Sequence, residues 1–222
     1  MKLNARAWFY IAAAAIVIAV GVFYVEVTRP ADVITAGGAT ASGGLDMTAF
    51  MEPGPLGEMA LGDPKAPNVV VEYASMTCPH CQRFHSDIYP EFKKKYVDTG
   101  KAYFIFRDYP LDPLAAAAIV LAHCAPKERF FPLVDLLFDR QGEWAFVKDP
   151  VTALQNLLKQ AGFTEDSFKA CLTNQSLLDG VNWVKDRANK QFGVDATPTF
   201  FINGKRFDGE QSIADLDKAL GG

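Results

Sequence analysis

Cys78 and Cys81 stand two residues apart in the stretch CPHC and are the side chains best suited to chemistry. The apolar run NVVVEYAS precedes them and an amphipathic segment follows, so Cys78 is expected where a strand enters a helix. A helix N-terminus stabilises an anion such as a thiolate through its unpaired N–H groups and its dipole. Cys81 lies one turn further on the same face, within reach of the Cys78 sulfur. The spacing therefore predicts a redox-active thiol pair, with His80 as a further donor or cation near the sulfur.

Other uses of a C-x-x-C pair fit less well. A tetrahedral zinc site needs four ligands, and Cys124 and Cys171 do not form a second pair at this spacing. A c-type haem attachment needs His directly after the second cysteine, where this chain has Gln82. A structural disulfide closing so short a loop would constrain the unfolded chain little. We therefore predict no metal and no cofactor.

The chain has 222 residues, half of them hydrophobic, and a net charge of -4. This length indicates one domain plus an additional segment. The Lys-rich stretch KKKYVDTGK is expected to be a solvated helix face, and the net charge is negative, so no nucleic-acid partner is expected.

The N-terminal segment, residues 1–27, has Lys2 and Arg6 before an apolar run long enough to span ~30 Å of hydrocarbon as a helix. The run is longer than a usual signal-peptide core, which favours an uncleaved signal anchor over a cleaved signal peptide. The basic flank predicts a cytoplasmic N-terminus, which places the rest on the periplasmic or extracytoplasmic face, where disulfides persist. Residues 28–56, rich in Gly, Ala, Pro, Ser and Thr, predict a flexible linker in which Phe50 and Met51 are candidates to dock on the domain.

The folded domain is expected over residues 57–222. Its pattern predicts strands alternating with helices and a helical insert at about 111–190, which together indicate an α/β fold around a mixed sheet. The local signals are Pro79 at a helix start, Pro90 as a kink or break in that helix, Asn203-Gly204 as a hairpin turn and Ser212 as an N-cap.

CPHC at a strand-to-helix junction, with LGDPKAPNVVVEYAS before it and TPTFFINGK downstream, resembles the DsbA-like thiol:disulfide oxidoreductases of the thioredoxin fold. The resemblance covers roughly residues 57–220. It implies a thioredoxin-like fold with a helical insertion, a nucleophilic cysteine of low pKa and an oxidising disulfide.

The resemblance also implies roles for individual residues. Cys78 would be the nucleophile that forms the mixed disulfide, Cys81 the resolving cysteine, and His80 the residue that stabilises the Cys78 thiolate. Thr197 and Pro198 resemble the cis-proline loop that pairs with the substrate backbone. The alternative for Pro198 is an ordinary proline at a strand edge.

Glu72 matches the position of a buried acid that moves protons to the resolving cysteine, and burial would raise its affinity for a proton. The alternative is an outward-facing strand residue. His85 is expected to be a surface or packing residue rather than a ligand, and His123 a structural one.

Cys124 and Cys171 remain. In an oxidising compartment two leftover cysteines most simply pair with each other, and some DsbA-like proteins carry such a non-catalytic disulfide. The alternative is two buried free thiols.

The predicted function is oxidation of cysteine pairs in reduced secreted or periplasmic proteins, followed by reoxidation by a DsbB-like membrane oxidase. Three alternatives stay open: a disulfide isomerase, a reductase of the same fold, and a copper protein that binds Cu(I) through Cys78 and Cys81.

Overall fold

The computed structural model describes residues 45–221. The predicted signal anchor at 1–27 and residues 28–44 of the predicted linker lie outside the described residues. Within residues 45–221, no helix is both long and apolar enough to cross a membrane.

The core of the domain is a five-stranded sheet with the strand order β1-β3-β2-β4-β5. Strands β2 and β3 run parallel, and every other neighbouring pair is antiparallel, so the predicted mixed sheet is confirmed. The strands are β1 (Met59–Leu61), β2 (Asn68–Ala74), β3 (Ala102–Asp108), β4 (Thr199–Ile202) and β5 (Lys205–Asp208).

Strand β2 is buried on both faces because helices cover the sheet from both sides. Val70 packs with the larger cluster beneath the helices that follow β2, whereas Val71 and Tyr73 pack with the smaller cluster on the opposite face. Side chains alternate between the faces of a strand, so Glu72 shares the face of Val70. The sequence therefore places a carboxylate in the larger apolar core.

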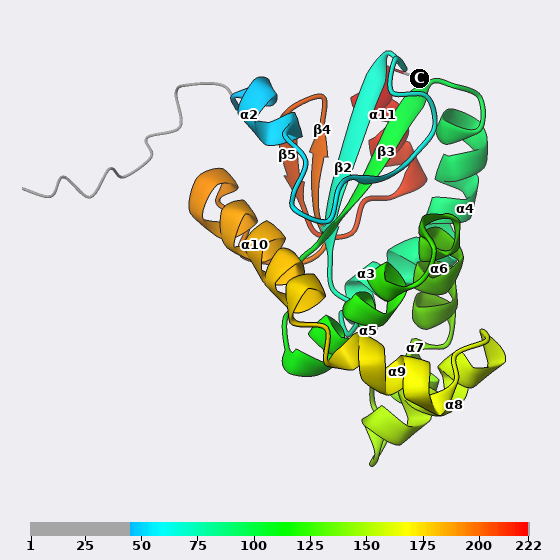
Figure 1. The fold of residues 1–222 in the computed structure, drawn as a ribbon. Helices are drawn as coiled ribbons and strands as arrows, with labels where there is room; N and C mark the ends of the chain where they lie inside the picture. Colours follow the sequence, from blue (N-terminus) through cyan, green and yellow to red (C-terminus); the bar gives the residue numbers. More distant parts are fainter. Residues whose placement is uncertain (1–44, 222) are drawn as a thin grey trace, which may run out of the picture. The chain divides into compact units, whose positions relative to one another are not determined.

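Helices cover the sheet and form a separate block beyond it (Figure 1). The helices flanking the sheet are α2 (Met47–Met51), α3 (Pro79–Arg83), α4 (Tyr89–Phe92) and α11 (Ile213–Leu220). The inserted helices between β3 and β4 are α5 (Pro113–Cys124), η3 (Lys127–Arg129), α6 (Phe130–Asp139), α7 (Gln141–Trp144), α8 (Pro150–Gln160), α9 (Glu165–Leu172) and α10 (Gln175–Phe192). The predicted helical insertion is confirmed.

The helix after the cysteines continues to Val97 but widens twice into a π-helical turn. The π-helical turns η1 (Phe84–Ile88) and η2 (Lys93–Val97) stand on either side of α4. Pro90 in α4 cannot donate a backbone hydrogen bond and its ring crowds the preceding turn. The wider turn η1 accommodates the proline, so Pro90 perturbs the helix without ending it.

The hairpin and the closing helix follow their sequence signals. Asn203 and Gly204 both have positive φ, 48° and 79°, as the tight turn between β4 and β5 requires. The side chain of Ser212 accepts a hydrogen bond from the backbone N–H of Asp215 and caps α11.

The predicted linker at 28–56 extends too far toward the domain. Helix α2 folds within it, and Phe50 is completely buried against Phe192, Phe201 and the guanidinium of Arg107. The composition predicted a linker over the whole segment because small residues dominate it on average, although its last part carries large apolar side chains. The docking expected for Phe50 is seen, and Met51 packs at the edge of the same cluster.

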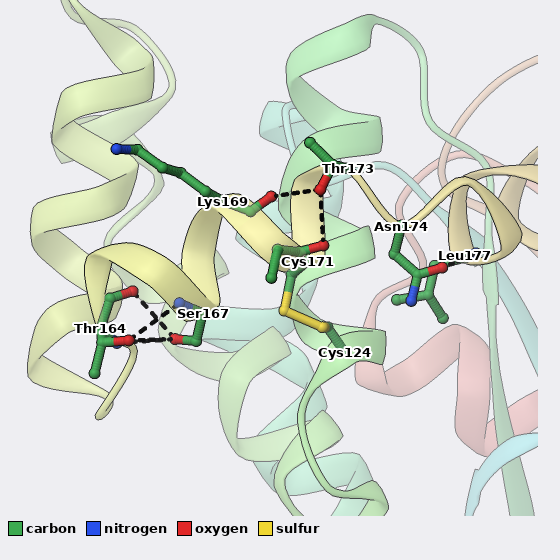
Figure 2. The surroundings of a disulfide bond; sticks show 9 residues. Cys124, Thr164, Ser167, Lys169, Cys171, Thr173, Asn174 and Leu177 are labelled. Atoms are coloured by element: carbon green, nitrogen blue, oxygen red, sulfur yellow. Dashed lines mark hydrogen bonds between the residues drawn. A yellow bond between two sulfur atoms is a disulfide. The ribbon is translucent and has the colours of Figure 1, made fainter.

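A disulfide joins Cys124, the last residue of α5, to Cys171 in α9, across a sequence separation of 47 residues (Figure 2). Helix α9 is independently fixed at its start by a reciprocal cap between Thr164 and Ser167. The disulfide therefore ties two helices of the insertion together.

Replacing Cys124 and Cys171 together by serine should lower the free energy of unfolding by about 4 kcal/mol. The reason is that a loop of this length loses roughly that much closure entropy when it is cross-linked in the unfolded chain. Urea denaturation of the oxidised wild type and the double variant measures the difference. An unchanged midpoint would contradict a stabilising role.

Candidate active site

The two cysteines lie where β2 leads into α3. Cys78 is the N-cap of α3, with an extended backbone (φ -81°, ψ 119°), and Pro79 occupies the first turn, where its missing N–H costs nothing. The Cys78 sulfur accepts a hydrogen bond from the backbone N–H of Cys81 at 3.4 Å. The expected strand-to-helix placement of Cys78 is therefore seen.

The sequence-distant loop before β4 completes the surroundings of Cys78. The peptide bond between Thr197 and Pro198 is cis, and the Cys78 thiol donates to the Thr197 carbonyl at 3.3 Å. Both cysteines are free in this state; Cys78 is 3% exposed and Cys81 is completely buried. Of the two sulfurs, Cys78 is thus the one closer to solvent and to the loop at 197–198.

The pKa values of the two thiols are shifted in opposite directions. A hydrogen bond from the Cys81 thiol, aided by N–H groups at the start of α3, lowers the pKa of Cys78 to about 5 against the effect of burial. Burial first, and then the Cys78 sulfur and the Glu72 carboxylate, raise the pKa of Cys81 well above the ordinary thiol range. At neutral pH the reduced pair therefore holds one thiolate, at Cys78, and one thiol, at Cys81.

The His80 ring points away from this sulfur. It is largely exposed, and its Nδ1 lies 2.5 Å from the Arg83 guanidinium and 3.5 Å from a Glu210 carboxylate oxygen. The contribution of His80 to the low pKa of Cys78 comes from its backbone N–H. The direct ring-to-sulfur contact expected from the sequence is therefore not seen in this state.

Glu72 is completely buried, so the outward-facing alternative is wrong. Its Oε2 lies 2.9 Å from Nε2 of His85, whose side chain is 1% exposed. The His85 ring stacks on Phe138 with centroids 4.3 Å apart. His85 was expected to be a surface or packing residue, and the structure shows that it is a packing residue and not a surface one. With Glu72 it forms a buried hydrogen-bonded pair that the sequence did not reveal.

A family model described as thioredoxin matches residues 56–221. The fold and the position of the cysteines agree with that match. Among solved structures, the chain is similar to alpha-DsbA1 of Wolbachia pipientis, with 32% sequence identity, a TM-score of 0.72 and coverage of 78% of this chain and 93% of that one.

The chain belongs to the thioredoxin family, as a DsbA-like member.

Curated relatives point the same way. The chain is 33% identical to a Rickettsia bellii protein provisionally named protein-disulfide oxidoreductase, over 73% of this chain and 64% of the relative. It is 27% identical to disulfide bond formation protein D of Bacillus subtilis, over 75% of this chain and 76% of that protein. The chain spans 59% to 64% of the length of the Rickettsia relatives that it matches.

Gln141 contributes to this DsbA-like site although no sequence signal marked it. It begins α7 in the helical insertion, is 3% exposed, and donates through Nε2 to the carbonyls of Met76 and Cys78, at 2.8 and 3.1 Å. A glutamine 63 residues from the cysteine has no motif that could reveal such a contact. The fold alone brings it to the active-site loop.

His123 forms a second buried pair, with its Nε2 2.8 Å from Asp108 Oδ2. This pair ties α5 to the end of β3, in keeping with the structural role expected for His123. Among residues 45–221, no three His, Cys, Asp or Glu side chains gather in a group suited to a metal ion.

The thiolate absorbance of the reduced protein should titrate with a midpoint near pH 5. Cys78 is charged above this pH and is protonated as the pH falls through it. Because its pKa is lower than the value of about 8.5 in an unfolded chain, its stabilisation of the reduced fold is complete above pH ~8.5 and is lost between there and pH 5. A far-ultraviolet absorbance titration tests this, with Cys78→Ser as the blank. A midpoint near 8.5 would contradict it.

Proposed function

We propose that this chain is a thiol:disulfide oxidoreductase that introduces disulfides into proteins outside the cytoplasm. In the oxidised enzyme Cys78 and Cys81 are joined. A substrate thiolate attacks the Cys78 sulfur, forms a mixed disulfide and releases Cys81, which takes up a proton. A second substrate thiolate then attacks the substrate sulfur of the mixed disulfide and expels Cys78 as a thiolate. Two electrons pass from substrate to enzyme. The substrate dithiol loses two protons in forming the attacking thiolates; one is balanced by the proton taken up at Cys81, and the other is released to solvent.

The observation that carries this proposal is the position of Cys78 at the N-cap of α3, where its sulfur accepts a hydrogen bond from the Cys81 N–H and its pKa is low. A thiol of low pKa is a good leaving group, so the mixed disulfide breaks readily at this sulfur. Relative to an ordinary thiol, a pKa of about 5 stabilises the reduced form at pH 7 by about 3 kcal/mol. That corresponds to about 60 mV in the two-electron potential, in the direction that makes the disulfide oxidising.

Neighbouring residues take supporting roles in this proposal. Thr197 and Pro198 lie beside Cys78 and offer backbone groups to an extended substrate segment. Glu72 exchanges the proton of Cys81, because it is the carboxylate whose charge acts on that buried thiol. His80, with its exposed ring, faces the incoming substrate rather than the sulfur.

The location and partners follow from the same chemistry. A disulfide between Cys124 and Cys171 suits an oxidising compartment, such as the periplasm. The N-terminal apolar segment would anchor the domain at the extracytoplasmic face of the inner membrane. Substrates would be reduced secreted proteins, and a DsbB-like membrane oxidase would restore the Cys78–Cys81 disulfide.

The test is the reduction potential of Cys78–Cys81, measured on the full chain in glutathione buffers at pH 7. A donor of disulfides should lie at about -120 to -180 mV, whereas a value near about -270 mV would indicate a reductase. Incubation of the oxidised protein with a reduced two-cysteine peptide then separates oxidase from isomerase. An oxidase forms the peptide disulfide stoichiometrically, while an isomerase acts mainly on mispaired disulfides. Absence of any exchange, together with stoichiometric Cu(I) binding, would favour the copper alternative.

A further inference from the structure

Gln141 is a buried amide whose position relative to the cysteines is unusual. Burying an amide without partners costs about 1–3 kcal/mol, so a buried glutamine is normally tied by hydrogen bonds. Here both hydrogen bonds of its Nε2 go to the active-site loop, to carbonyls on either side of Thr77. The amide therefore links the helical insertion to the loop that carries Cys78.

The carbonyl of Cys78 controls how the chain enters α3. Pro79 has no N–H, so the peptide unit between the two residues can be held only through this oxygen. Two donors hold it: the backbone N–H of Gln82 at 3.0 Å and the Gln141 amide at 3.1 Å. The orientation of this unit decides whether the N–H groups of α3 face the Cys78 sulfur.

The Met76 carbonyl is the second oxygen that Gln141 holds. Carbonyl oxygens carry partial negative charge, which repels a thiolate when they turn toward it. An amide donor that engages these oxygens keeps them turned away and offsets their charge. The Gln141 contact thus favours the reduced, charged state of Cys78.

The short helix α7 that carries Gln141 is held in place at its other end. Trp144, at the other end of α7, is completely buried, and its indole N–H donates to the Leu137 carbonyl at 2.8 Å. Because α7 is a single turn held at Trp144, the backbone of Gln141 is kept close to the loop that carries Cys78.

We propose that Gln141 is a positioning residue of the redox centre, whose amide holds the Met76 and Cys78 carbonyls and so sets the stability of the Cys78 thiolate. This inference rests on the proposed thiol–disulfide exchange at Cys78. It assigns to the helical insertion a part in tuning the cysteine pair, in addition to shaping the surface around it.

The principal test is Gln141→Met, which removes both donors and roughly keeps the length and volume of the side chain. The midpoint of the thiolate absorbance of the reduced variant should rise by about one pH unit. Its equilibrium with glutathione should shift about tenfold toward the disulfide, which is the corresponding change in the oxidation constant. The titratable groups around the cysteines, Glu72, His80 and Glu210 with Arg83, are unchanged in this variant.

Two control variants separate positioning from general destabilisation. Trp144→Phe removes the indole bond to Leu137 and weakens the same corner while leaving the amide contacts in place. Gln175→Met removes an exposed amide that donates to Asp179 on α10. Both should keep the wild-type midpoint and glutathione equilibrium. A Gln141→Met variant that loses stability but keeps both values, as Trp144→Phe does, would overturn the proposal.

A measurement on the unaltered protein covers the case in which Gln141→Met does not fold. The side-chain amide protons of Gln141, observed by NMR, should exchange slowly with solvent and shift when the Cys78–Cys81 disulfide is reduced. Free exchange in both redox states would overturn the proposal. The absorbance titration needs no redox partner, so a wild type that titrates near pH 5 but exchanges no disulfides refutes the proposed function alone.

Discussion

Replacement of Cys81 by serine should trap the protein as a mixed disulfide, whereas replacement of Cys78 by serine should abolish exchange. In Cys81→Ser the thiolate at Cys78 remains, and the serine hydroxyl can still donate a hydrogen bond to it. The first attack on an oxidised glutathione molecule therefore proceeds, but no second thiol resolves the adduct. Intact-protein mass measurement should show one glutathione per chain for Cys81→Ser and none for Cys78→Ser.

The difference in adduct formation between the two variants follows from the pKa values of the Cys78 and Cys81 thiols. At pH 7 a thiol with a pKa of about 5 is ~99% thiolate, while one above the ordinary value of about 8.5 is a few per cent at most. The thiolate populations thus differ by more than about 30-fold, and complete burial of Cys81 adds to this. Rapid adduct formation at Cys81 in the Cys78→Ser variant would contradict the assignment of roles.

The parts of this site that could be predicted from the sequence are those encoded locally. A run of β-branched residues followed by CPHC defines a strand, a turn and a helix start within one short stretch, so the placement of Cys78 needed no tertiary information. The Asn203-Gly204 turn and the Ser212 cap are local in the same sense. Their conformations follow from the backbone preferences of a few adjacent residues.

The contacts that the sequence did not reveal all join distant segments. Gln141 reaches the Cys78 loop only because α7 packs beneath it, and glutamine is a common residue with no characteristic spacing. His85 was expected to be a surface or packing residue, and the sequence did not indicate its buried partner, Glu72, which lies in strand β2. Phe50 was expected to dock on the domain, but the composition of its segment, which resembles a linker, did not reveal helix α2 or the aromatic partners of Phe50. In each case tertiary packing decided what local pattern could not.

The same limit applies to His80. Its place between the cysteines suggested a ring beside the sulfur, but at the second position of a helix a side chain projects outward. The backbone N–H points toward the N-cap instead. The position of His80 beside Cys81 in the sequence therefore identified the right residue, but the group that acts on the Cys78 sulfur is its backbone N–H and not its ring.

Replacing His85 by alanine should lower the free energy of unfolding by roughly 3–5 kcal/mol. The change leaves the Glu72 carboxylate buried without its partner and opens a cavity beside Phe138, with which the imidazole stacks. Chemical denaturation of the reduced protein measures the loss. His80→Ala is the matched control, because the His80 side chain is 62% exposed and its removal should change stability by less than about 0.5 kcal/mol.

A double variant, Glu72→Leu with His85→Leu, separates the stability lost to the unpaired carboxylate from the stability lost to the cavity. Filling the site with apolar side chains removes the cost of taking two polar groups out of water, so the double variant should be close to the wild type in stability, or above it. A double variant as unstable as His85→Ala would show that packing, and not the unpaired carboxylate, dominates the loss.

If stability is recovered while resolution of the mixed disulfide slows, the pair is retained for proton exchange with Cys81 and not for folding. A buried carboxylate that costs stability is otherwise hard to account for in a core lined by aromatic rings. The proposed use is at the Cys81 thiol, on whose pKa the Glu72 charge acts and which is itself completely buried.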